Sequence, residues 1–163
     1  MKTRRSVISY ALAAPLSAAL PQSARAAKGV ELALIVRPQS SLQELSLSSL
    51  RHVFLSAPVS EPNGDRLVPY NHPLRAPDRV AFDRLVLRLD PEDVARLWLD
   101  RKIRGQPNPP RTVDSLAALL RAVATVAGAI GYIRAGFVTK DVRVIKIEGR
   151  LPGQAGYPLI FAE

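Results

Sequence analysis

The feature that most constrains how this chain folds is an alternation of short apolar runs with stretches of helical periodicity. Residues 31–37 form an apolar run that ends at Pro38, which predicts a buried strand. Apolar residues at helical spacing then predict a helix over residues 47–55, with Ser46 as its N-cap. Because the chain repeats this order, we predict an α/β domain with a mixed, mostly parallel sheet flanked by helices.

The same patterns predict the remaining elements. Further strands are expected at residues 66–70, 129–133, 142–147 and 158–161. Further helices are expected after a capping Asp78, from Pro91 behind Asp90, and from about Val113 to Gly128. In α/β sheets, ligands bind at the carboxyl ends of the strands, where helix N-termini attract anions.

Length and composition fit one globular domain, which we place at residues 27–163. The chain has 163 residues, of which 47% are hydrophobic and 23% are charged, so it can bury a core of ordinary size. It has no cysteine, which excludes disulfides, thiolate metal sites and a cysteine nucleophile. No cofactor is expected.

The first residues have the three zones of a secretory signal peptide. A basic start at residues 2–5 precedes an apolar stretch at 7–20 and the small residues Ala24 and Ala26. We therefore expect a signal peptide over residues 1–26 and a periplasmic or secreted domain without a membrane anchor. An uncleaved N-terminal helix is the alternative, and the choice between the general and the twin-arginine export route stays open.

The charge of the chain limits its partners only loosely. The formal net charge is +9 at pH 7, and part of it lies in the predicted signal peptide. A modest positive balance outside the cytoplasm argues against nucleic acid as a partner and is compatible with an anionic ligand. Simple solubility explains the same balance equally well.

No pattern in the sequence indicates an enzyme or a metal site. The two histidines, His52 and His72, lie far apart and lack metal-ligand spacing. The sequence has no nucleophile elbow, phosphate-binding loop or dinucleotide fingerprint. Glu92 and Asp93 stand in the first turn of a predicted helix, where acids complement the helix dipole. We therefore expect a non-enzymatic protein.

A series of segments, taken in order, resembles the phosphate-type solute-binding proteins of ABC transporters. The segments include the Ser-Leu-rich stretch 41–55, the Asn-Gly-Asp stretch 63–71, the Trp-to-Pro-Pro stretch 98–110, the Gly-Ala-Ile-Gly-Tyr stretch 128–132 and the Gly-Tyr-Pro-Leu stretch 156–159. The resemblance covers about residues 31–160. It implies the fold of one lobe of a type II periplasmic binding protein, a class in which two lobes enclose the ligand.

The same resemblance places a ligand loop at residues 72–78. The family pattern there is Arg-x-x-x-Ser-Gly-Thr, whereas this chain has His72 at the Arg position and Ala76, Pro77 and Asp78 at the last three. Two hydroxyl donors are therefore lost, and proline supplies no backbone N–H. The aspartate also brings a carboxylate to the place where an anion would bind.

The candidate ligand-binding residues are Ser40, Ser41, His72, Arg75 and Arg79. Guanidinium groups pair well with phosphate oxygens, although surface arginines are common without any such role. The resemblance implies a weak site for phosphate or another oxyanion. The alternative is an accessory domain that has lost its ligand and instead binds a protein partner or a transporter.

Overall fold

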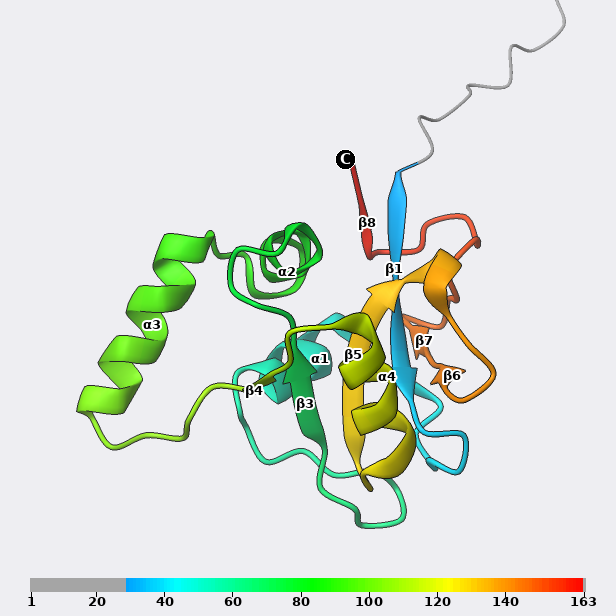
Figure 1. Cartoon of the computed structure of the whole chain (residues 1–163), viewed down its shortest axis with the longest axis horizontal. Helices are drawn as coiled ribbons and strands as arrows, with labels where there is room; N and C mark the ends of the chain where they lie inside the picture. Colours follow the sequence, from blue (N-terminus) through cyan, green and yellow to red (C-terminus); the bar gives the residue numbers. More distant parts are fainter. Residues whose placement is uncertain (1–28, 163) are drawn as a thin grey trace, which may run out of the picture.

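The computed structural model describes residues 29–162, and a mixed sheet lies at the centre of the domain (Figure 1). The strand order is β4-β3-β5-β1-β6, and β8 also pairs with β1. These strands are β1 (Val30–Val36), β3 (Val68–Asn71), β4 (Arg111–Thr112), β5 (Ala129–Arg134), β6 (Arg143–Val144) and β8 (Ile160–Phe161). A separate parallel pair joins β2 (Glu44–Leu45) to β7 (Lys146–Ile147).

The direction of β1 decides how the ends of the strands are arranged. Strand β3 is parallel to β4 and β5, whereas β1 is antiparallel to β5, β6 and β8. Among the described strands of this sheet, β1 therefore runs in the opposite direction to the others. Its carboxyl end lies at one end of the strands, and the carboxyl ends of β3 and β5 lie at the other (Figure 1). The predicted mixed, mostly parallel sheet with flanking helices is confirmed.

Helices cover both faces of the sheet. They are α1 (Leu47–Phe54), α2 (Pro77–Phe82) continued by the π-helix η1 (Asp83–Leu87), α3 (Pro91–Ile103), α4 (Leu116–Thr125) and the 3₁₀ turn η2 (Ala135–Phe137). Alternate residues of a strand point to opposite faces, so Leu34 joins the core under α1 and α2. Its neighbour Ile35 joins Leu119 and Val123 of α4 in a second cluster on the other face.

The helix starts depend on local caps where a serine is present. Ser46 caps α1 as expected, since its hydroxyl accepts from the backbone N–H of Ser49. Helix α4 starts at Leu116 behind Ser115, later than expected. The position of Asp90 as the N-cap of α3 is confirmed, although its carboxylate binds Arg84 rather than a backbone N–H.

Two expectations were wrong. Asp78 does not cap α2, because Ala76 is the N-cap and Pro77 takes the first helical position. The strand expected at residues 142–147 is divided between two sheets, since β6 pairs with β1 and β7 pairs with β2. At the junction the N–H of Ile145 bonds to the carbonyl of Leu34, so the chain passes directly from one sheet to the other.

Within residues 29–162 no helix is both long enough and apolar enough to cross a membrane. The predicted signal peptide over residues 1–26 lies outside the described residues.

Candidate functional site

The predicted ligand-binding residues fall into two groups at opposite ends of the sheet. Ser40 and Ser41 follow the carboxyl end of β1, whereas His72, Arg75 and Arg79 follow the carboxyl end of β3. Because these two strands point in opposite directions, the two groups of residues lie at opposite ends of the strands (Figure 1). A single small anion cannot contact both groups.

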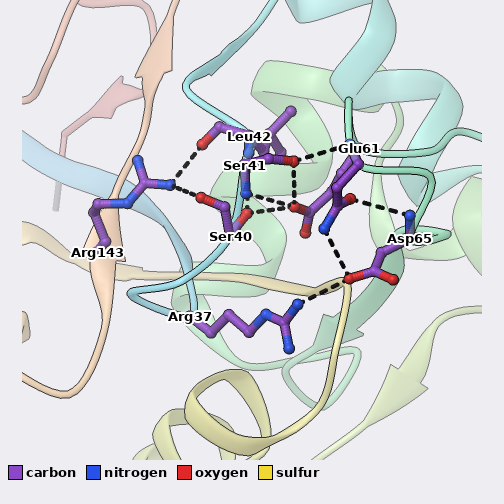
Figure 2. Close-up of polar contacts among 8 residues, drawn as sticks. Arg37, Ser40, Ser41, Leu42, Glu61, Asp65 and Arg143 are labelled. Atoms are coloured by element: carbon purple, nitrogen blue, oxygen red, sulfur yellow. Dashed lines mark hydrogen bonds and ion pairs between the residues drawn. The ribbon is translucent and has the colours of Figure 1, made fainter.

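The two serines already bind a carboxylate of the chain itself (Figure 2). Oε2 of Glu61 accepts from the Ser40 hydroxyl at 2.8 Å, from the Ser41 N–H at 2.9 Å and from the Ser41 hydroxyl at 3.1 Å. We call these three donor groups the serine cradle. Glu61 is only 3% exposed and Ser40 is 6% exposed, whereas Ser41 is half-buried, so the side chain of Glu61 fills a cradle that is only partly shielded from solvent.

Two arginines fix the loops on either side of the serine cradle. Arg143 donates to the backbone carbonyls of Ser40 at 2.7 Å and Leu42 at 2.8 Å. Arg37 forms an ion pair with Asp65 at 2.8 Å, which ties the end of β1 to the loop that carries the buried carboxylate. Figure 2 shows both guanidinium groups turned toward these loops and engaged there.

At the other end of the sheet, the side chain of His72 is hydrogen-bonded to the backbone of β5. Its Nε2 lies 2.9 Å from the carbonyl oxygen of Tyr132, and a carbonyl can only accept, so Nε2 carries the hydrogen. The imidazole also meets the Tyr132 ring edge-on at 5.1 Å. One of the two ring nitrogens is therefore unavailable to an anion.

Arg79 is a buried structural cation in this structure. Its Nε lies 2.6 Å from Oδ2 of Asp83, and the two side chains are 6% and 1% exposed. Its Nη1 also donates to the carbonyl of His72 at 3.1 Å, so the guanidinium supports the loop from below. Burial raises the pKa of Asp83 above its usual value near 3.8, and the guanidinium of Arg79 offsets only part of that effect.

An aromatic stack forms the floor beneath this loop. The Phe82 ring stacks on Tyr132 at 3.8 Å, and Phe54 packs against Phe82 at 4.6 Å. The Tyr132 hydroxyl donates to the side-chain oxygen of Asn71, which is also buried. Burial is the largest cause that raises the pKa of Tyr132 well above 10, so the phenol stays a neutral donor.

The start of α2 offers little to an anion. Asp78 forms an ion pair with Arg134 at 2.8 Å, so a carboxylate already stands in the first turn. Pro77 has no N–H to donate. Of the five predicted ligand residues, Arg75 is exposed and makes no hydrogen bond or ion pair within the described part of the chain.

Metal binding has no support in residues 29–162. No group of three or more His, Cys, Asp or Glu side chains in this part of the chain could hold a metal ion. The side chains that the loop after β3 can offer to an anion are the exposed guanidinium of Arg75 and the half-buried imidazole of His72.

Sequence reasoning missed Glu61, Asn71 and Tyr132 as site residues. Glu61 has no local signal because its partners Ser40 and Ser41 lie 21 and 20 residues earlier in the chain. The Tyr132 hydroxyl meets Asn71 across 61 positions. Only the polar end of an apolar strand could have drawn attention to Asn71.

No protein-family model and no curated protein sequence matches the chain. Its fold, however, is similar to that of solved structures. An ABC-type phosphate transport receptor from Vibrio cholerae matches with a TM-score of 0.60 and 17% identity, over 76% of this chain and 48% of the receptor. PstS from Borrelia burgdorferi matches with a TM-score of 0.59 and 14% identity, over 76% of this chain and 49% of PstS.

A third similar structure contains a ligand. It is a Clostridium perfringens protein assigned to the phosphate ABC transporter substrate-binding proteins, solved with bound phosphate. The TM-score is 0.59 and the identity 18%, over 74% of this chain and 46% of the other. The resemblance indicated by the sequence motifs is thus confirmed at the level of the fold, and the chain spans about half the length of each of these three proteins.

Proposed function

We propose that this chain is an exported, non-enzymatic domain of the solute-binding type, with a degenerate site for phosphate or another oxyanion. The fold shared with a phosphate transport receptor supports the binding role. The absence of catalytic motifs from the sequence agrees with a protein that binds rather than transforms its ligand.

The observation that carries the proposal is the internal pairing around the loop after β3. The Arg79 guanidinium is bound to Asp83, and the Asp78 carboxylate stands at the start of α2. Arg75 is then the cation that an anion would meet, and one exposed charge in water attracts an ion only weakly. We expect a dissociation constant for phosphate in the millimolar range or larger. This corresponds to a binding free energy of about −4 kcal/mol or a less negative value.

Thermal melts with phosphate and sulfate test this site. Ligand that binds the folded state raises the melting temperature, by an amount set by the ratio of its concentration to the dissociation constant. Arg75→Ala should remove any rise, whereas Arg121→Ala, a change of an exposed arginine on α4, should leave it intact. An equal rise in both variants would place anion binding elsewhere.

Export rests on the three zones of residues 1–26 and is tested separately. We expect the protein isolated from its native host to begin after Ala26, which intact mass spectrometry would detect. A mature chain that still begins at Met1 would contradict export by signal cleavage.

A second candidate function is an accessory domain that binds a protein partner. Leu99 and Ile103 of α3 are 60% and 77% exposed, which is unusual for large apolar side chains on a helix. Figure 1 shows α3 standing away from the sheet. If no oxyanion shifts the melt, and Leu99→Gln with Ile103→Gln abolishes co-elution with a larger native complex, this candidate replaces the first.

A further inference from the structure

We propose that the serine cradle is a carboxylate-binding site that the chain fills with its own Glu61. When this side chain is shortened, a free small carboxylate should bind in its place. This site and the loop after β3 lie at opposite ends of the strands, so the inference does not rest on the proposed function.

The hydroxyl groups of the cradle are oriented before any carboxylate binds. Ser40 Oγ accepts from the backbone N–H of Leu42 at 3.2 Å, and Ser41 Oγ accepts from the N–H of Asn63 at 3.2 Å. Each hydroxyl has a single hydrogen, and the accepted bond turns that hydrogen toward Oε2 of Glu61. Together with the N–H of Ser41, three donors converge on one oxygen.

The backbone of the cradle is held independently of its occupant. Arg143 of β6 donates to the main-chain carbonyls of Ser40 and Leu42, and its third bond goes to Oε1 of Gln43 at 3.3 Å, so none of these bonds involves Glu61 and all should persist when it is changed. The opposing loop is closed by its own backbone, because the N–H of Glu61 bonds to the carbonyl of Asp65 at 2.8 Å. Truncation of the side chain should therefore leave the donors close to their present positions.

The chemistry of the cradle favours a charged acceptor. Hydrogen bonds to an ionised carboxylate oxygen are about twice as strong as those to the neutral oxygen of an amide or a hydroxyl. Oε1 of Glu61 is buried with no described hydrogen-bond partner. The occupant is thus held through one oxygen, which suits a small planar carboxylate rather than a tetrahedral anion that must satisfy several oxygens.

Acetate is the matched probe. Glu61→Ala removes the Cγ methylene and the carboxyl group, and these are the heavy atoms of acetate. Thermal melts of this variant at pH 7 and constant ionic strength, with chloride as the reference salt, should show a rise with acetate. For a dissociation constant of about 10 mM, 100 mM acetate increases the folded-to-unfolded ratio about elevenfold and raises the melting temperature by about 4 °C.

Controls separate the cradle from a general salt effect. Wild type and Glu44→Ala, a change at an exposed glutamate of β2, should not respond to acetate beyond the chloride reference. Glu61→Ala combined with Ser40→Ala and Ser41→Ala should lose the response, because the two hydroxyls supply two of the three donor contacts and only the backbone N–H of Ser41 remains. Glu61→Gln keeps the cavity filled and should not respond either.

The variant also remains informative if it is unfolded in chloride. In that case acetate should restore a cooperative melt, followed by circular dichroism, at concentrations that do not change wild type. No gain in Glu61→Ala, an equal gain in wild type or Glu61→Gln, or a larger gain with phosphate than with acetate would each overturn the proposal.

Discussion

Removal of the Arg79 guanidinium is the perturbation for which the structure gives the clearest magnitude. Arg79→Met keeps most of the apolar length of the side chain but leaves the carboxylate of Asp83, 1% exposed, without its cation at 2.6 Å. Breaking a buried ion pair on one side costs about 3–5 kcal/mol. The lost bond to the His72 carbonyl adds about 1 kcal/mol.

Urea denaturation followed by tryptophan fluorescence and circular dichroism measures this loss. Arg79→Met should reduce the free energy of unfolding by about 5 kcal/mol at pH 7, a large part of the stability of an ordinary domain. Arg79→Met with Asp83→Leu should recover most of it, since replacing a whole buried pair by apolar groups is often neutral or stabilising. A double variant no more stable than the single one, or a single variant that loses less than about 1 kcal/mol, would refute the reasoning.

The pH dependence gives the same test a sign. Burial raises the pKa of Asp83 from 3.8, so its contribution to stability is fully present below that value and is lost as pH rises through the folded-state pKa. The loss is larger without Arg79, which lowers that pKa. Arg79→Met should therefore be less damaging near pH 4 than at pH 7, when each variant is compared with wild type at the same pH.

Further predictions concern the sheet. Gly128 has a φ of +71°, and a Cβ there would lie 2.1 Å from the carbonyl oxygen of Arg66, so Gly128→Ala should cost about 3 kcal/mol in urea denaturation. Gly136→Ala, where no atom lies within 4 Å of the added Cβ, should stay within about 0.5 kcal/mol. Tyr132→Phe leaves the buried oxygen of Asn71 unpaired and should lower stability by about 1–3 kcal/mol, a loss that an unchanged unfolding midpoint would disprove.

The parts of the fold that depend on neighbouring residues were predictable from the sequence. The apolar run of β1 and the Ser46 cap of α1 are local patterns, and both were found where expected. Asp78 shows where local reasoning fails, because its carboxylate binds Arg134, 56 positions away, instead of capping α2. A pattern of polar residues does not reveal a partner at that distance.

The candidate site was less predictable for the same reason. The family resemblance predicted a weak anion site in the loop after β3, which stays a prediction, and the structure adds that Arg79 is used internally. The pairing of Ser40 and Ser41 with Glu61 depends on how two loops meet at the edge of the sheet. Nor could the sequence show that the serines and the residues of the loop after β3 lie at opposite ends of the sheet, because this required knowing that β1 is antiparallel to β5.

Calorimetric titration of phosphate into the purified protein tests the central claim most directly. The account predicts heats that fit a dissociation constant in the millimolar range or weaker, because Asp78 occupies the start of α2 and Arg75 is the remaining exposed cation. Asp78→Thr removes the carboxylate, restores a hydroxyl donor and should tighten binding if the loop is the site. Micromolar binding by the wild-type protein would contradict the account.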